Sequence, residues 1–311
     1  MYKEKRPARS EFVPIRGLRY HALHWGTGPT AGPSTGAETP PLVLVHGWMD
    51  VAASYQFMID AFSEVFLTGR RVLAPDWRGF GLTPAGSADS FWFPDYLADL
   101  DFLLDHYFPG QQVDLVGHSM GGNVAMLYGG VRPERIRRLV NLEGFGLAAT
   151  RPSQAPGRYA KWMDELKGLH AGDVALKSYD SAAGVAQRLM KTNPRLDAGK
   201  AAWLAERWAK ADDKGNWNIL GHAAHKISNP QLYRVEEMLE IYKRITAPVL
   251  SVEADSDSLS QWWKGSYTLD EFHERLKLVP QVQTAVIADA GHMLHHDQAE
   301  ALACLLENFL A

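Results

Sequence analysis

Residues 117–121 read Gly117-His118-Ser119-Met120-Gly121, so a serine stands between two glycines. The apolar run at 113–116 is typical of a buried strand, and small and apolar residues at helical spacing follow over 123–130. A serine at such a strand-to-helix turn takes strained backbone angles, and flanking glycines leave room for it. The stretch therefore predicts a nucleophile elbow, with Ser119 at a helix N-terminus where backbone N–H groups favour negative charge.

Composition narrows the class of protein. The chain has 311 residues, 46% of them hydrophobic, which is enough to bury a large core. Its net charge of −4, with both signs interspersed, predicts no nucleic-acid partner. Neither a secretory signal nor the roughly 20 apolar residues of a membrane span is recognisable, so we expect a cytoplasmic protein without membrane contact. The single cysteine, Cys304, lies in an apolar run and is expected to be a buried thiol.

Apolar strands alternate with helical patterns along much of the chain. Residues 11–15 and 18–25 flank Gly17 and predict an antiparallel hairpin, whereas 26–41 is rich in Gly, Pro, Thr, Ala and Ser and predicts a surface loop. Further strands are expected at 42–45, 71–74, 136–141, 249–252 and 284–288, and helices at 51–66, 94–107 and 297–309. This alternation predicts an α/β fold with a mostly parallel sheet covered by helices on both faces.

About a hundred residues interrupt that pattern. Residues 147–245 have helical apolar spacing at 158–167, 182–191, 198–209 and 232–244, broken by prolines and glycines, and contain no strand of the buried type. We therefore expect a helical cap at 147–245, inserted into a core formed by 1–146 and 246–311. The last helical stretch, 232–244, could alternatively lead back into the sheet.

A serine hydroxyl needs a base to take its proton and an acid to orient that base. His292 follows the strand at 284–288, and Asp257 lies just past the strand at 249–252, so both belong to loops at the carboxyl edge of the sheet. The order Ser119, Asp257, His292 is the one that this kind of fold requires. Asp255 and Glu143, which follow strands in the same way, are alternative acids; we favour Asp257.

Backbone N–H groups must stabilise the oxyanion that forms on the substrate carbonyl. We assign this role to Trp48 and Met120, and Gly47 allows the backbone to approach closely. His46 is expected to form structural hydrogen bonds in the same turn. We assign substrate contacts to residues of this turn, of an aromatic loop and of the cap, namely His46, Gly47, Phe91, Trp92, Phe93 and Trp162.

With these residues assembled, the sequence resembles the α/β-hydrolase fold superfamily, specifically its lid-bearing, carboxylesterase-like serine hydrolases. The motifs that carry the resemblance are 46–48, 75–81, 117–121, 248–257 and 291–292. The resemblance implies an eight-stranded type of sheet with a helical cap after the sixth strand. It also implies that Ser119 is the nucleophile, His292 the general base and acid, and Asp257 the orienting carboxylate. Asp76 and Arg78 are expected to lock a loop.

Several chemistries share this machinery. Dehalogenases and epoxide hydrolases of the superfamily carry an aspartate at the elbow, so Ser119 favours acyl transfer and, by default, hydrolysis of carboxylic esters. Lactonase, thioesterase, C–C hydrolase, perhydrolase and hydroxynitrile lyase activities remain alternatives, as does a weakly catalytic ligand-binding protein. We expect no cofactor, and no metal at His292, His295 and His296 or at His222 and His225, because no carboxylate-rich or HExxH pattern accompanies them. The expected substrate is a small to medium, uncharged, apolar ester; the sequence leaves the oligomeric state open.

Overall fold

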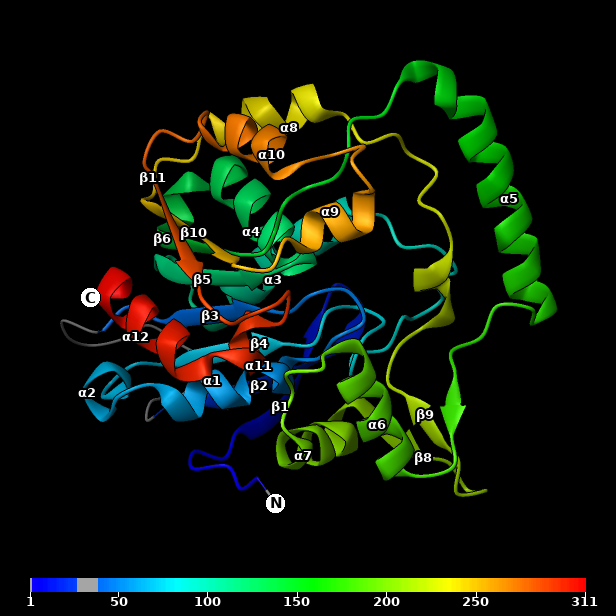
Figure 1. The fold of residues 1–311 in the computed structure, drawn as a ribbon, viewed down its shortest axis with the longest axis horizontal. Coiled ribbons are helices and arrows are strands. Elements are labelled where there is room, and N and C mark those ends of the chain that lie inside the picture. Colours follow the sequence, from blue (N-terminus) through cyan, green and yellow to red (C-terminus); the bar gives the residue numbers. More distant parts are fainter. Residues whose placement is uncertain (1, 27–38) are drawn as a thin grey trace.

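A mostly parallel, eight-stranded sheet runs through the computed structural model, which describes residues 2–26 and 39–311 (Figure 1). The strand order is β1-β2-β4-β3-β5-β6-β10-β11, and the strands from β4 to β11 are parallel to one another, whereas β1 and β2 are antiparallel neighbours at one edge. The strands are β1 (Arg9–Ile15), β2 (Leu18–Trp25), β3 (Leu42–Val45), β4 (Val72–Pro75), β5 (Val113–His118), β6 (Ile136–Leu142), β10 (Val249–Ala254) and β11 (Val282–Ile287). The predicted parallel sheet and its leading hairpin are confirmed.

The register brings the carboxyl ends of the central strands to one edge. Val45 of β3 pairs with Gly117 of β5, and His118 pairs with Leu142 of β6. Val252 of β10 also pairs with Leu142. The loops that follow these strands therefore start side by side, which is how residues distant in sequence meet in an open α/β sheet.

Helices cover both faces of this sheet (Figure 1). Side chains alternate between the faces, so Val43 and Val45 of β3 pack in one hydrophobic cluster and Leu42 and Leu44 in the other. The first cluster includes residues of α3 (Pro94–Tyr107), α4 (Met120–Val131), α8 (Val235–Tyr242) and α10 (Leu269–Leu276). The second includes residues of α1 (Gln56–Ala61), α2 (Glu64–Leu67), α11 (Leu294–Asp297) and α12 (Ala299–Leu310).

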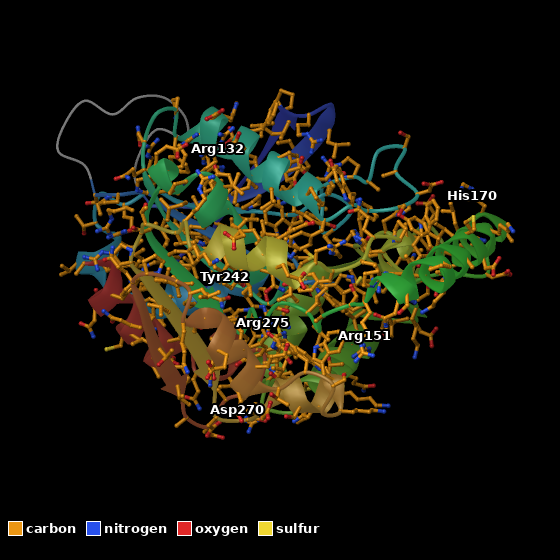
Figure 2. The ribbon with its side chains drawn as sticks, turned by 90° about the horizontal axis from the view of Figure 1, so that it is seen from above. Arg132, Arg151, His170, Tyr242, Asp270 and Arg275 are labelled. Atoms are coloured by element: carbon orange, nitrogen blue, oxygen red, sulfur yellow. The ribbon has the colours of Figure 1, made fainter. Side chains whose placement is uncertain are left out.

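The segment after β6 carries helices of its own and a small sheet. It contains α5 (Ala155–Ala171), α6 (Ala182–Thr192), α7 (Ala198–Trp208) and an antiparallel sheet in the order β7 (Ser178–Tyr179), β9 (Trp217–Ile219), β8 (Ala209–Ala211). Figure 2 shows His170 at the outer end of α5, well away from Tyr242 of α8. The helices α6 and α7 pack on the core through a third cluster that includes Val51, Phe57 and Ala299.

The remaining helical elements are short. The 3-10 helices are η1 (Ala52–Tyr55), η2 (Pro133–Arg135), η3 (Pro152–Gln154) and η4 (Ala223–Lys226), and α9 (Ser258–Trp263) follows β10. Among residues 2–26 and 39–311, no helix is both long enough and apolar enough to cross a membrane.

Some sequence-based boundaries need correction. The helix expected at 51–66 is divided into η1, α1 and α2, because Phe62 is extended and the side chain of Ser63 accepts a hydrogen bond from the N–H of Phe66. Cys304, expected to be buried, is exposed on α12. The small sheet of β7, β8 and β9 was not predicted, since its strands have only two or three residues.

The last helix of the predicted cap packs on the core. A Cβ built on Gly130 of α4 would lie 2.1 Å from the carbonyl oxygen of Ile241, so α8 and α4 are in backbone contact. This agrees with the alternative in which 232–244 leads back to the sheet, while the division at 147 and 245 remains a prediction. Residues 27–38 of the predicted surface loop lie outside the described residues.

Candidate functional site

Ser119 stands at a strained turn between β5 and α4. Its backbone angles are φ 52° and ψ −116°. This conformation is energetically unfavourable for any residue other than glycine. The turn is held by hydrogen bonds from the Ser119 N–H to the Leu142 carbonyl, 2.8 Å, and from the Asn123 N–H to the Ser119 carbonyl, 3.0 Å. The predicted strand-turn-helix around Ser119 is therefore present in the structure.

Gly117 and Gly121, on either side of Ser119, allow neighbouring backbone segments to approach closely. A Cβ on Gly117 would lie 2.2 Å from the Gly121 carbonyl oxygen, and a Cβ on Gly121 would lie 2.1 Å from the Val45 carbonyl oxygen. Both obstacles are backbone atoms, which cannot turn away as a side chain would. Steric demand thus explains why both positions are glycine.

Replacing Gly121 by alanine should therefore lower the free energy of unfolding by about 3 kcal/mol, because the new methyl group overpacks the α4–β3 contact. Gly157→Ala is a matched control in another helix, α5, since nothing lies within 4 Å of a Cβ there. This control should gain about 0.5 kcal/mol from helix propensity. Urea denaturation measures both, and equal midpoints for the two variants would contradict the steric explanation.

The imidazole of His292 faces Glu143 and not Asp257, the acid favoured from the sequence. The loop after β11 brings His292 Nδ1 to 3.2 Å from Glu143 Oε2. Glu143 directly follows β6, is buried, and is fixed by hydrogen bonds from the Ala254 N–H, 2.7 Å, and the Ser258 hydroxyl, 2.5 Å. These contacts make Glu143 a rigid acceptor for the imidazole.

The choice of Asp257 as the partner of His292 is thereby corrected. Asp257 is exposed and caps the N-terminus of α9, where its carboxylate accepts hydrogen bonds from the N–H and the hydroxyl of Ser260. Asp255 is also exposed; it accepts from the N–H groups of Asp289, 2.8 Å, and Ala290, 3.1 Å, and so holds the loop that leads to His292. Both carboxylates are thus bound to backbone N–H groups, and neither has a hydrogen bond to the imidazole among the described residues.

Burial sets the protonation of the pair. It lowers the pKa of His292 to about 3, so its imidazole is neutral at neutral pH. Burial also raises the pKa of Glu143 to about 7, against the opposing effect of its hydrogen bonds from Ser258 and Ala254. With Nδ1 donating to Glu143, the lone pair of a neutral His292 is on Nε2, where a base must carry it.

The turn after β3 lies against Ser119. A Cβ on Gly47 would come within 3.1 Å of Ser119 Cβ, and Trp48 follows directly, while Met120 is the first residue of α4. The backbone positions assigned to the oxyanion hole are therefore neighbours of the serine.

His46 is structural. It is fully buried, its Nδ1 donates to the Gly47 carbonyl, 2.8 Å, and its Nε2 accepts from the Trp77 N–H, 2.9 Å. The structural role expected for His46 is confirmed, whereas the structure does not support its assignment as a substrate contact, because the residue is fully buried.

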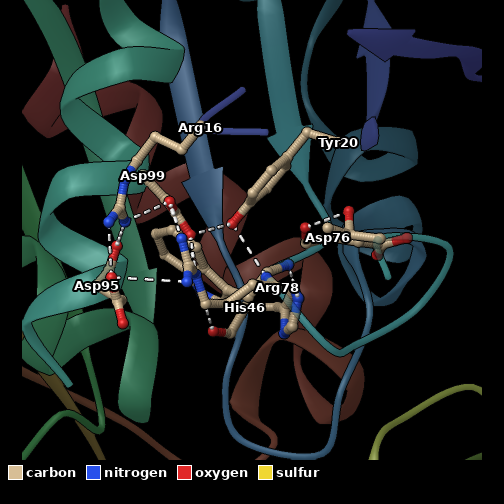
Figure 3. A network of polar contacts seen from close by, with 9 residues as sticks. Arg16, Tyr20, His46, Asp76, Arg78, Asp95 and Asp99 are labelled. Carbon is tan, nitrogen blue, oxygen red and sulfur yellow. Dashed lines mark hydrogen bonds and ion pairs between the residues drawn. The ribbon is translucent and has the colours of Figure 1, made fainter. Parts of the chain in front are cut away.

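The loop that includes Asp76 and Arg78 is locked by ion pairs and hydrogen bonds. Arg16, Tyr20 and Arg78 converge on the buried carboxylate of Asp99 (Figure 3). The carboxylate of Asp76 accepts from the N–H groups of Ala52, 2.7 Å, and Leu82, 2.8 Å. The expected loop-locking role of Asp76 and Arg78 is confirmed.

A cavity of about 550 Å³ opens at Ser119 and His292. Its walls come from the turn after β3, from α6, α7 and the loop between them, and from the loops near α9 and after β11. The lining residues besides Ser119 and His292 are Gly47, Trp48, Met49, Asp50, His118, Arg188, Leu189, Thr192, Asn193, Pro194, Arg195, Leu196, Leu204, Trp208, Ser256, Ser258, Gln261, Trp262, Gly291, Met293 and His296.

Four aromatic residues predicted to contact substrate do not line this cavity. Phe91 stacks on His225, with ring centroids 3.7 Å apart, and Phe93 packs against the core. Trp92 donates to Gln231, and Trp162 donates to Ser90, 3.3 Å. Their rings pack instead against the loop before α3 and the segment that follows the small sheet, so this cavity does not support their assignment as substrate contacts.

Apart from Trp48, the aromatic and charged residues of the cavity wall were not predicted as site residues. Trp262 contacts the His292 ring edge-on, with centroids 4.2 Å apart, and Trp208, Arg188 and Arg195 come from the segment after β6. Amphipathic spacing predicted the helices that carry Trp208 and Arg188, but it does not reveal which of their residues face the serine.

A buried polar group lies behind Ser119. His118 Nε2 donates to the His292 carbonyl, 2.7 Å, which leaves Nδ1 of His118 as an acceptor; this atom and Asp50 Oδ2 have no hydrogen-bond partner among the described residues. With His295 they form a two-histidine, one-carboxylate group whose ligand atoms lie within 4.8 Å of one another. In a tetrahedral zinc site, ligand atoms lie 2.0–2.1 Å from the ion and would therefore be about 3.4 Å from one another. Of the histidines that the sequence analysis considered as metal ligands, only His295 belongs to this group.

The chain is similar in sequence and in fold to several known proteins. The chain is 25% identical over 313 residues to a "Serine hydrolase-like protein" of Danio rerio, covering 98% of this chain and 89% of that one. It is 27% identical over 285 residues to the "sn-1-specific diacylglycerol lipase ABHD11" of Mus musculus, covering 88% and 82%. Among solved structures, the "Thioesterase Domain From Curacin Biosynthetic Pathway" superposes with a TM-score of 0.79 at 24% identity, covering 96% and 99%.

The family model described as "alpha/beta hydrolase fold" matches residues 40–299, which include every strand from β3 to β11 and the residues around Ser119 and His292. The chain belongs to the alpha/beta hydrolase fold family.

Proposed function

We propose that this protein hydrolyses carboxylic esters through Ser119, His292 and Glu143. The observation that carries the proposal is the contact between His292 Nδ1 and the buried, doubly hydrogen-bonded Glu143, with His292 and Ser119 lining one cavity. Nucleophile, base and orienting acid are the three parts that acyl transfer needs. The serine hydrolase-like and lipase names of the relatives support the same class.

In the proposed reaction, His292 Nε2 takes the proton of the Ser119 hydroxyl as its oxygen attacks the ester carbonyl. The N–H groups of Trp48 and Met120 stabilise the oxyanion. His292 then protonates the leaving alcohol, and an acyl group remains on Ser119. A water molecule, deprotonated by His292, releases the acid and restores the serine.

The cavity supports a substrate with an apolar body. Its volume of about 550 Å³ suits a small to medium molecule, and its walls carry Leu189, Leu204, Trp208 and Trp262. We further propose that residues of 147–245 act as a cap, because α6 and α7 supply much of the wall of the cavity that Ser119 lines.

A panel of p-nitrophenyl esters of increasing acyl length, with a lactone and an epoxide, tests the reaction class. We expect turnover of esters, strongest at short to medium acyl length, and a fluorophosphonate adduct on the peptide that contains Ser119. Absence of both the adduct and ester turnover in the folded protein would reject the proposal. Turnover of the epoxide alone would point to a different chemistry.

A further inference from the structure

Arg188 is a cation in the wall of the catalytic cavity, and no residue of 2–26 or 39–311 gives it an anionic partner. It projects from α6 beside the cavity residues Leu189 and Thr192 and is partly buried. No carboxylate among the described residues forms an ion pair with it. Two guanidinium groups with little exposed surface do have such partners: Arg70 pairs with Asp114 at 2.9 Å, and Arg78 pairs with Asp99.

Arg195 adds a second guanidinium at the rim. A Cβ built on Gly291 would lie 3.3 Å from Arg195 Nη1, so this charge is next to the His292 loop. Arg195 pairs with Asp289 at 3.5 Å, and both side chains are exposed to solvent, so this ion pair is weak.

Negative charge in the wall is scarce. Asp50 is the one carboxylate among the described lining residues, and burial raises its pKa to about 7. The histidines of the wall, His118, His292 and His296, have pKa values lowered by burial and are neutral at neutral pH. The cavity is therefore electropositive in a chain whose net charge is −4.

We propose that Arg188, assisted by Arg195, forms an anion-binding subsite and that the natural ester carries a carboxylate on its acyl chain. This inference rests on the proposed ester hydrolysis and departs from the uncharged substrate expected from the sequence. A guanidinium binds a carboxylate through two parallel N–H bonds, and partial burial strengthens that contact. Because Arg195 is exposed, solvent weakens its contact with an anion, so Arg188 is the principal cation of the subsite. One principal cation favours a carboxylate over a dianionic phosphate.

The test compares matched substrates. Mono-p-nitrophenyl esters of glutarate, adipate and suberate each have a neutral counterpart of equal length in which a methyl group replaces the carboxylate. In the wild-type protein, the kcat/KM ratio of anionic to neutral ester should reach about 10 to 100 at one chain length, the range expected for a charge-assisted hydrogen bond. Arg188→Met should reduce this ratio at least tenfold, and Arg188→Lys should retain part of it.

Lys191→Met is the control, because it removes the same charge from the exposed side of α6 and does not line the cavity. The control should keep the wild-type ratio. Inhibition of p-nitrophenyl butyrate hydrolysis by the free dicarboxylates gives an independent readout, and it should weaken in Arg188→Met but not in Lys191→Met.

Two results would overturn the subsite: a wild-type ratio of one or less at every length, or an unchanged ratio in a folded Arg188→Met variant. Stronger, Arg188-dependent inhibition by alkyl phosphates than by matched carboxylates would overturn the carboxylate assignment. In each of these cases neutral esters are still hydrolysed. Failure of the proposed function is distinct, since no p-nitrophenyl ester would then turn over and no adduct would form on Ser119.

Discussion

Ser119→Ala is expected to lower kcat for p-nitrophenyl butyrate by at least about 10⁴-fold, because no other hydroxyl is held at the elbow to form the acyl intermediate. The substitution removes one oxygen from a partly exposed side chain, so the fold should persist. Steady-state kinetics and labelling with a fluorophosphonate measure the loss, and circular dichroism checks the fold.

Ser153→Ala is the matched control for this experiment. Ser153 is an exposed serine of η3, outside the cavity, and its loss should leave turnover and labelling at the wild-type level. If Ser119→Ala still formed the fluorophosphonate adduct and hydrolysed the ester, another residue would be the nucleophile.

Glu143→Gln should lower kcat by about 10³ to 10⁴-fold, whereas Asp257→Asn should change it less than about threefold. The amide of a glutamine cannot compensate the positive charge that develops on His292, 3.2 Å away. Asparagine is as good a helix N-cap as aspartate, so Asp257→Asn should leave α9 in place. The two variants, assayed side by side, identify the acid; a larger loss in Asp257→Asn would contradict the assignment of Glu143.

The pH profile of the wild-type protein gives a second readout of the same carboxylate. Burial raises the pKa of Glu143 to about 7, and its ionised form, which predominates above that pH, is the one that stabilises protonated His292. The acid limb of kcat/KM should therefore lie near pH 7, with activity falling as the pH drops. A limb near pH 3, the pKa of His292, would mean that ionised Glu143 is not required.

The alternation of apolar strands and helices was sufficient to predict the sheet. Strands such as Leu42–Val45 are buried on both faces and read as continuous apolar runs, which few other structures produce. The break at Phe62 and Ser63 was not predicted, because the helical apolar spacing of 51–66 continues across it. The helices α9 and α10 were missed, since they are short and follow a polar loop.

By itself the sequence determined the elbow at Ser119 and the histidine at 292, because local sterics and strand-end positions are encoded by neighbouring residues. Only the tertiary structure decided which carboxylate faces His292: Glu143 and Asp257 both follow strands, and their difference lies in packing, since one is buried against β10 and the other caps a helix. The cavity wall was decided in the same way. Arg188 belongs to an ordinary amphipathic helix, and its position in the wall of the cavity that Ser119 also lines arises from contacts between segments far apart in the chain.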